Sequence, residues 1–312
     1  ERELFEIGGN LRADPRVTHA LTLEVDNFGN VLKSASIGYG RRFQDLSLTT
    51  DDQKKQTDTL ATYAENAYTN AVLEADAYRA PLLCEARTYE LLNLNYGASH
   101  SILPGITNLF RFGEIAAQVQ NAGDGNHDLA YEDINHTQAT TTNSYRRLIE
   151  HVRTRYRQND LTGFSPLGTV EPLALPGESY KLAFTPNLAK TIYVDSGKLS
   201  AGDVNTVFGT EGGYVHSEGD ATWWIPSGEV FYSPTPNDLP APELSFARAH
   251  FFLPHRYRDP FGNEAIMTYD SDDTTPSKNH NLLLVEIKDP LGNIVTVRTQ
   301  DDAGNIKIRN DY

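Results

Sequence analysis

The sequence contains few residues that could form covalent cross-links or cysteine-based metal sites. Its 312 residues include one cysteine, Cys84. A single thiol excludes an internal disulfide and a zinc site made of cysteines. No histidine stands near Cys84 in the sequence, so we expect a buried structural thiol and not a nucleophile.

Positive charge and long apolar runs are also scarce. Lys and Arg number 27 against 42 Asp and Glu, which gives a formal net charge of -15. This balance disfavours nucleic acids and anionic membrane surfaces as partners. No stretch approaches the roughly 20 consecutive apolar residues that span a membrane. Hydrophobic residues still make up 39% of the chain, so we expect a folded protein with a sizeable core.

A five-residue pattern, Asp-x-x-Gly-Asn, occurs four times, and residues that favour β-strands follow each copy. The aspartate accepts a hydrogen bond from the backbone two residues later, and the glycine adopts the left-handed conformation of a type I turn with a G1 bulge. We therefore predict hairpin turns. The predicted turn residues are Asp26, Gly29, Asn30, Asp259, Pro260, Gly262, Asn263, Asp289, Pro290, Gly292, Asn293, Asp301, Gly304 and Asn305.

The rest of the chain predicts a mainly antiparallel β fold with little helix. Weak alternation over residues 57–72 favours a strand, and the spacing of apolar residues over 106–120 favours a short amphipathic helix. Residues 145–157 fit a helix or a strand equally well. No low-complexity linker divides the sequence, so we expect residues 1–312 to form a single section. Its start at Glu1 and its one methionine, Met267, indicate a piece of a longer chain.

No motif of a known catalytic class occurs, and we predict no catalytic, cofactor-binding or metal-binding residue. The segment from Asp124 to Asp128 imitates the start of a calcium loop. However, Leu129 stands where such a loop needs glycine, and Asn135 stands where it needs a bidentate glutamate. The histidine pair His250 and His255 shows no metal-ligand spacing with carboxylates.

Two further features allow a functional and a structural interpretation. Trp223 and Trp224 could form a platform that stacks against a sugar, but neighbouring residues of a strand face opposite ways, so we expect one indole in the core and one outside. Two arginine groups with interleaved aromatics could form a nucleic-acid surface. Because the chain is acidic, we favour internal ion pairs with carboxylates. These arginines are Arg146, Arg147, Arg153, Arg155, Arg157, Arg248, Arg256 and Arg258.

Several segments in order along the chain resemble the RHS/YD-repeat region of the B component of bacterial insecticidal toxin complexes. They are Thr18–Lys33, Pro81–Leu91, Arg147–Arg153, Gly212–His216, Trp223–Pro234 and His250–Asn263. The resemblance implies a curved antiparallel sheet of hairpins that forms part of a hollow shell. It also implies a C component that completes the shell, a pore-forming A component, an enclosed cytotoxic cargo and secretion of the complex.

The resemblance has limits. Propeller repeats that would dock the A component are not visible in the sequence. The self-cleaving motif of the family ends in Gly-Leu, whereas Gly292 is followed by Asn293, so no protease role is carried over. We predict a non-enzymatic section of the shell. The alternatives are a β-rich module that binds a glycan or protein near Trp223 and Trp224, and a hydrolase whose carboxylates the sequence does not pair.

Overall fold

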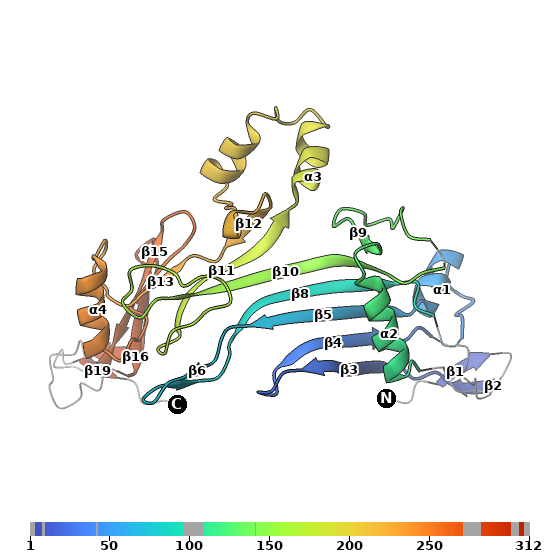
Figure 1. Cartoon of the computed structure of the whole chain (residues 1–312), viewed down its shortest axis with the longest axis horizontal. Helices are drawn as coiled ribbons and strands as arrows, with labels where there is room; N and C mark the ends of the chain where they lie inside the picture. Colours follow the sequence, from blue (N-terminus) through green and yellow to red (C-terminus); the bar gives the residue numbers. More distant parts are fainter. Residues whose placement is uncertain are drawn as a thin grey trace. The chain divides into compact units, whose positions relative to one another are not determined.

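The computed structural model describes residues 4–7, 10–41, 43–95, 109–140, 142–270, 282–300 and 306–308. The chain divides into two compact units, whose elements are labelled in Figure 1. Unit 1 consists of Glu1–Ala67 and Glu85–His151, and unit 2 consists of Tyr68–Cys84 and Val152–Tyr312. The chain therefore passes twice from unit 1 to unit 2.

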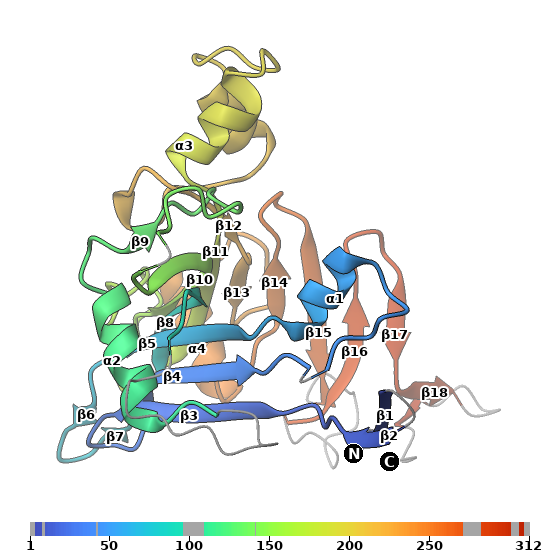
Figure 2. The same ribbon diagram turned by 90° about the vertical axis from the view of Figure 1, so that its right-hand side faces the viewer.

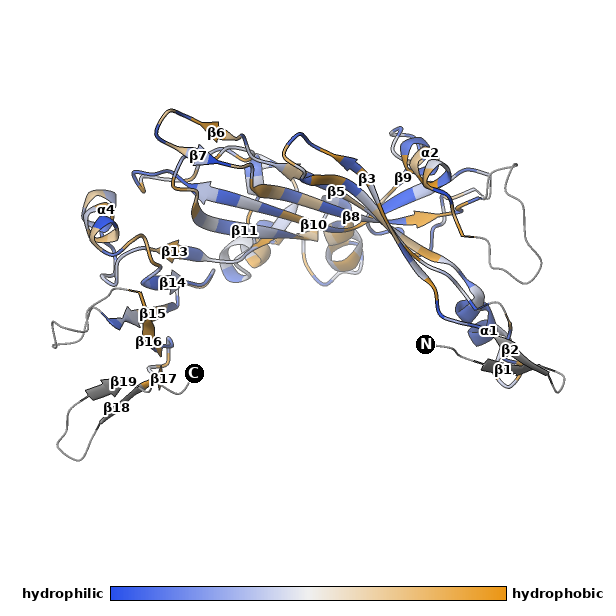
Figure 3. Ribbon diagram, turned by 90° about the horizontal axis from the view of Figure 1, so that it is seen from below, coloured by the Kyte–Doolittle hydropathy of each residue, from blue (hydrophilic) through white to orange (hydrophobic). Residues whose placement is uncertain are grey.

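Unit 1 is built on an antiparallel sheet with the strand order β10-β8-β5-β4-β3. The strands are β3 (Thr18–Val25), β4 (Val31–Gly38), β5 (Leu60–Tyr68), β8 (Leu83–Leu92) and the first part of β10 (Tyr145–Arg157). Polar and apolar residues alternate along these strands (Figure 3). Such alternation gives the sheet one apolar face.

The helix α2 (Phe112–Ala122) covers that apolar face (Figures 1 and 2). Its buried residues Ile115 and Val119 pack in one cluster with Ile37 of β4 and Tyr63 of β5. The remaining elements of unit 1 are short. They are β1 (Leu4–Ile7), β2 (Asn10–Ala13), α1 (Thr50–Thr57) and β9 (Asp128–Leu129).

The described residues of unit 2 form part of the largest sheet, a five-stranded sheet, two two-stranded sheets and two α-helices. The second part of β10 pairs with β11, and β11 pairs with β12, both antiparallel. A five-stranded antiparallel sheet follows in the order β13-β14-β15-β16-β17. The elements are β6 (Val72–Leu73), β7 (Tyr78–Arg79), β11 (Leu175–Phe184), β12 (Trp223–Pro226), β13 (Glu229–Phe231), α4 (Pro240–Ala249), β14 (Arg256–Arg258), β15 (Glu264–Tyr269), β16 (Leu284–Lys288), β17 (Ile294–Thr296), β18 (Arg298–Gln300) and β19 (Ile306–Ile308).

A helical insertion joins β11 to β12 in unit 2. It comprises α3 (Pro186–Ala189), two turns of π-helix, η1 (Lys190–Val194) and η2 (Thr206–Glu211), and a short 3-10 turn, η3 (Ser217–Gly219). Ala189, Phe208 and Trp223 form the buried centre of the insertion. It therefore has a small apolar core of its own.

The predicted mainly antiparallel β fold with a few helices is confirmed. The strand favoured over residues 57–72 is β5, and the undecided segment 145–157 is β10. The predicted helix over 106–120 begins too early, because Leu109 and Phe110 precede α2. The side chain of Glu114 accepts a hydrogen bond from the Arg111 amide, which fixes the helix start there. The single section over residues 1–312 stays a prediction.

Candidate functional site

Three of the four Asp-x-x-Gly-Asn segments lie in the described part of the chain, each between two paired strands. In the first, Asp26 Oδ1 accepts hydrogen bonds from the amides of Phe28 at 2.8 Å and Asn30 at 2.9 Å. The Asn30 side-chain amide donates to Asp26 Oδ2 at 2.9 Å. The Gly29 amide donates to the Asp26 carbonyl at 3.1 Å, with φ of +84° at Gly29. These bonds close the turn between β3 and β4.

The turns after β14 and β16 repeat this arrangement. The Asn263 amide donates to Asp259 Oδ1 at 2.9 Å, and the Asn293 amide donates to Asp289 Oδ1 at 2.8 Å. Pro260 and Pro290 occupy the second positions, and Gly262 and Gly292 have φ of +82° and +86°. The hydrogen bond from the asparagine side chain lowers the pKa of all three turn aspartates. The fourth copy, with Asp301, Gly304 and Asn305, lies outside the described residues.

The arginines of β10 in unit 1 are bound to carboxylates. Arg146 donates to Glu65 at 2.9 Å and also pairs with Asp128. Arg147 pairs with Glu90, which also accepts a hydrogen bond from His136 at 2.7 Å. Although burial raises the pKa of Glu90, the hydrogen bonds from Arg147 and His136 bring it below the ordinary value. These pairs join β10 to β5, β8 and the segment that contains β9.

The arginines of β10 in unit 2 are also bound to carboxylates. Arg153 donates to Asp220 at 2.7 Å, and Arg155 lies 3.4 Å from Glu218. Arg157 donates to both carboxylate oxygens of Glu243, at 2.9 and 3.1 Å. Arg157 and Glu243 are both buried. The strand is therefore tied to the η3 region and to α4 by charge-assisted hydrogen bonds.

The second arginine group lies around β14. Arg256 is 1% exposed, with its guanidinium 4.1 Å from the centre of the Phe231 ring. Arg256 and Arg258 both bind Glu264. The ion-pair interpretation of the arginines is confirmed for all of them except Arg248, which lies in the last turn of α4.

The expectation that one indole of the Trp223-Trp224 pair faces outward is wrong. Trp223 is 6% exposed and packs edge-on against Phe208, with ring centroids 5.4 Å apart. Trp224 is 1% exposed, and its Nε1 donates to Asp220 at 2.9 Å beneath the Arg153 guanidinium. The two side chains face opposite ways as a strand requires, but the insertion covers one of them and the β10 arginine covers the other.

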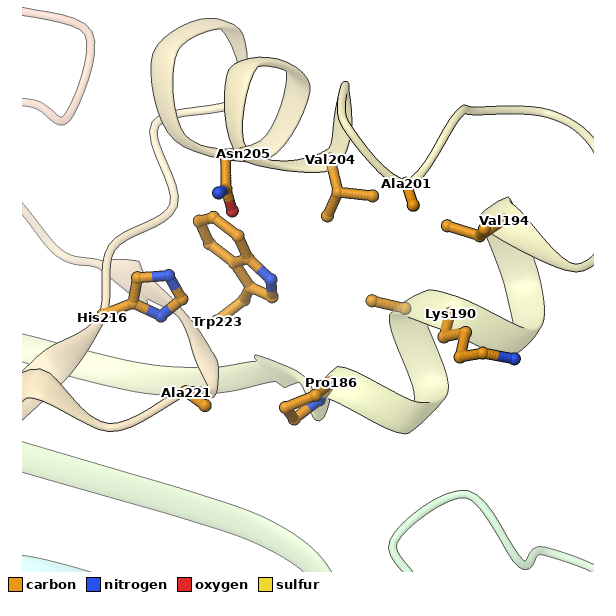
Figure 4. Close-up of a pocket in the computed structure, with 10 residues that line it drawn as sticks. Pro186, Lys190, Val194, Ala201, Val204, Asn205, His216, Ala221 and Trp223 are labelled. Atoms are coloured by element: carbon orange, nitrogen blue, oxygen red, sulfur yellow. The ribbon is translucent and has the colours of Figure 1, made fainter.

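A pocket of about 430 Å³ opens beside Trp223 in the helical insertion (Figure 4). The elements α3 and η1, the start of β12 and the segments that connect the helical turns supply its wall. Its lining residues are Pro186, Ala189, Lys190, Val194, Ala201, Val204, Asn205, His216, Ala221 and Trp223. Most of these side chains are apolar, which is typical of sites for small organic ligands.

The remaining candidates have ordinary structural surroundings. Cys84 is 3% exposed, as expected for a buried thiol. Asp124 accepts hydrogen bonds from Asn126 and His127, and Asp128 is bound to Arg146. Among the described residues, no three His, Cys, Asp or Glu side chains converge on a common point. No helix in the described ranges is long and apolar enough to cross a membrane.

Residues 9–82 match the family described as the insecticide toxin TcdB middle/C-terminal region. This match confirms the resemblance to the B component of insecticidal toxin complexes. The matched TcdB segment contains β3, the turn at Asp26–Asn30, β4 and β5. No curated protein matches the sequence of this chain.

Three solved structures of TcdB2 or holotoxin assemblies are similar to this chain. The TcdB2-TccC3-Cdc42 structure has 17% identity and a TM-score of 0.49, over 94% of this chain and 13% of that chain. The TcdB2-TccC3 structure has 18% identity and a TM-score of 0.48 over the same shares. The holotoxin pore of Photorhabdus luminescens with a TccC3 mutation has 17% identity and a TM-score of 0.49, again over 94% and 13%. This chain thus spans about an eighth of the length of those chains.

Sequence reasoning did not find the pocket in the insertion. A signal for the helix that forms part of it was present, because Thr185 followed by Pro186 is a common helix start. The Thr185 hydroxyl accepts the Leu188 amide at 3.0 Å. The pocket itself depends on the fold of residues 190–222 against Trp223, for which the sequence contains no periodic pattern.

Proposed function

We propose that this chain is a non-enzymatic section of the shell wall formed by the B component of an insecticidal toxin complex. The match of residues 9–82 to the TcdB middle/C-terminal region carries the proposal. In this function the strands belong to a curved sheet of RHS/YD-type hairpins, and the Asp-x-x-Gly-Asn turns fix the register of each hairpin. The shell encloses a cytotoxic C-terminal cargo until delivery.

The same proposal assigns the partners. A C component completes the shell, and the pore-forming A component binds parts of the B component other than this chain. The complex is secreted and acts outside the producing cell. In the similar structures TccC3 accompanies TcdB2.

Side-chain contacts between the strands of one sheet support a wall function. In unit 1, Arg146 of β10 lies 4.5 Å from the Tyr89 ring of β8 and reaches Glu65 of β5. His151 of β10 lies 2.7 Å from Glu85 of β8. A cross-strand pair adds to the backbone ladder and resists shear between strands. A sheet whose strands are held together by such pairs is suited to form a closed wall.

The experiment compares the accessibility of the two faces of the unit 1 sheet. Thr22 is exposed on β3, on the face opposite α2, because its neighbours Leu21 and Leu23 pack toward the α2 core. Ala117 is exposed on α2 itself. Thr22→Cys and Ala117→Cys therefore place one thiol on each side, and the buried Cys84 contributes little background.

In the isolated chain both new thiols should react with iodoacetamide and with a maleimide carrying a long polyethylene glycol chain. The same two thiols are then tested in the B component that contains this chain, after assembly with its C component. There, one of the two thiols should react with iodoacetamide but not with the large maleimide. The face that excludes the large reagent is the cavity face. Equal reaction of both positions with the large reagent in the assembled complex would refute a closed wall.

The alternative of a glycan-binding module at Trp223 and Trp224 is weakened by the burial of both indoles, since a stacking platform must be exposed. A glycan array probed with the isolated chain separates the two functions. A shell section should give no signal, and a specific glycan lost on Trp223→Ala would favour the binding module.

A further inference from the structure

The pocket beside Trp223 has the composition of a small-molecule site. Its volume of about 430 Å³ lies in the lower part of the range of about 300–1,000 Å³ that is usual for ligand pockets. Small apolar side chains form most of its wall, among them Ala189, Val194, Val204 and Ala221. The largest side chain of the lining is the indole of Trp223.

Trp223 brings a hydrogen-bond donor to this apolar wall. Its side chain is 6% exposed, and within the described residues its Nε1 has no hydrogen-bond partner. The pyrrole edge that carries Nε1 faces the pocket interior (Figure 4). Its neighbour differs, because Trp224 Nε1 donates to Asp220 at 2.9 Å. This N–H opens into the pocket, so it marks the position where a ligand acceptor would bind.

The surrounding contacts hold the indole in place. Phe208 packs against it edge-on at 5.4 Å, and the His216 ring lies 4.1 Å from it. His216 Nδ1 lies 2.8 Å from the Thr222 carbonyl oxygen, which orients the imidazole. The donor is therefore pre-positioned by the protein, which reduces the ordering cost of binding.

The charges at the pocket favour a neutral ligand. The single charged side chain of the lining is Lys190. Its Nζ lies 2.7 and 2.8 Å from the two carboxylate oxygens of Asp195, so the ammonium is compensated. An anionic ligand would have to compete with Asp195 for the Lys190 ammonium, and a cationic ligand would be repelled by that ammonium.

We propose that this pocket binds a small neutral molecule with an apolar body and one carbonyl oxygen, which accepts a hydrogen bond from Trp223 Nε1. The proposal does not depend on the shell function. It concerns residues of unit 2 that lie outside the matched TcdB segment.

The test uses acetophenone and ethylbenzene, which differ by the replacement of a carbonyl group with a methylene. The sequence has two tryptophans, so a ¹⁵N-labelled chain gives two indole N–H signals. Acetophenone should shift the Trp223 signal downfield with saturation, and ethylbenzene should not cause the downfield shift. The Trp224 signal should stay in place because its N–H is already bound to Asp220.

Two variants separate the hydrogen bond from the cavity. Trp223→Phe keeps an aromatic wall but removes the donor, so the affinity of acetophenone relative to ethylbenzene should fall by about 2- to 13-fold. Ala201→Leu narrows the pocket and should weaken both probes. The Trp224 signal reports whether each variant is folded.

Three results would overturn the proposal. The first is a Trp223 signal that neither probe moves up to its solubility limit. The second is a shift that persists unchanged in Ala201→Leu, which would place binding elsewhere. An unchanged ratio of the two affinities in Trp223→Phe would also reject the assigned hydrogen bond.

Discussion

Removing the charge of Glu243 tests whether buried ion pairs hold unit 2 together. Glu243 lies on α4, is 2% exposed and accepts two hydrogen bonds from Arg157 at 2.9 and 3.1 Å. It also accepts the Tyr232 amide at 2.7 Å. Arg157 donates in addition to the Leu161 carbonyl at 2.7 Å. In Glu243→Gln the size of the side chain is kept, but the guanidinium loses its counter-charge.

The magnitude follows from the burial of the remaining charge. Loss of one partner of a buried ion pair typically costs about 3–5 kcal/mol. The glutamine carbonyl can still accept one hydrogen bond, so we expect the lower end of that range, about 3 kcal/mol. The matched control is Asp195→Asn, because Lys190 and Asp195 lie 2.7 Å apart with side chains 62% and 49% exposed. Exposed pairs contribute about 0–1 kcal/mol.

Urea unfolding followed by tryptophan fluorescence measures both variants. Both tryptophans, Trp223 and Trp224, belong to unit 2, so the signal reports that unit. With a urea slope of about 2 kcal/mol/M, Glu243→Gln should lower the midpoint by about 1.5 M. Asp195→Asn should lower it by less than about 0.5 M, and 1 M salt should reduce that effect. Equal midpoint shifts for the two variants would refute the reasoning.

Three further predictions concern a turn, a carboxyl group and the thiol. Gly292 has φ of +86° and no atom within 4 Å of an added Cβ, so Gly292→Val should cost about 1–2 kcal/mol through backbone strain alone and lower the melting temperature. Gly113→Ala in α2, also without a neighbour but with an ordinary φ, should not lower it. Burial, together with the charge of Glu229, raises the pKa of Glu178 against the opposing hydrogen bond from Tyr180. The stability contributed by its protonated form is complete below the ordinary pKa of 4.5 and is lost as the pH rises through the higher folded value. Glu178→Gln should therefore gain urea stability relative to the native chain between about pH 4 and 7, and a pH-independent difference would contradict this. Cys84, 3% exposed, should react with a thiol reagent slowly in the folded chain and rapidly in denaturant, and rapid reaction of the folded chain would show an accessible thiol.

The parts of the fold that the sequence predicts well are local. In an Asp-x-x-Gly-Asn segment the aspartate bonds to groups within the next four residues, so the geometry is contained in the motif. A strand directly follows each of the three described copies, as β4, β15 and β17. Mainly antiparallel β structure follows from such hairpins without knowledge of distant contacts.

The features that sequence reasoning missed depend on residues far apart in the chain. Strand alternation predicts that the two indoles face opposite sides of the sheet, but it does not predict which residues cover each side. We therefore expected one indole to be exposed. Trp224 is covered by Arg153, 71 positions earlier, and Trp223 is covered by Phe208 of the insertion. The pocket has the same origin, because its walls come from segments that contact one another only after the insertion folds.

The ambiguous segment 145–157 shows how distant partners decide a local structure. Leu148, Val152 and Tyr156 recur every four residues, which fits one face of a helix and also one face of a strand. The carboxylates that surround the segment favour the strand over the helix. A strand extends Arg147 toward Glu90 and Arg157 toward Glu243, at its two ends.

The same arginines also explain how β10 could find its register. No Asp-x-x-Gly-Asn segment precedes or follows β10, and residues 158–174 separate it from β11, so a tight turn does not set the pairing. A slip by one residue would move Arg153, Arg155 and Arg157 to the other face of the sheet. Each would then leave its carboxylate partner, and the buried Glu243 would lose both of its guanidinium bonds. An unpaired buried charge is costly, so the ion pairs penalise the slipped register and select the observed one.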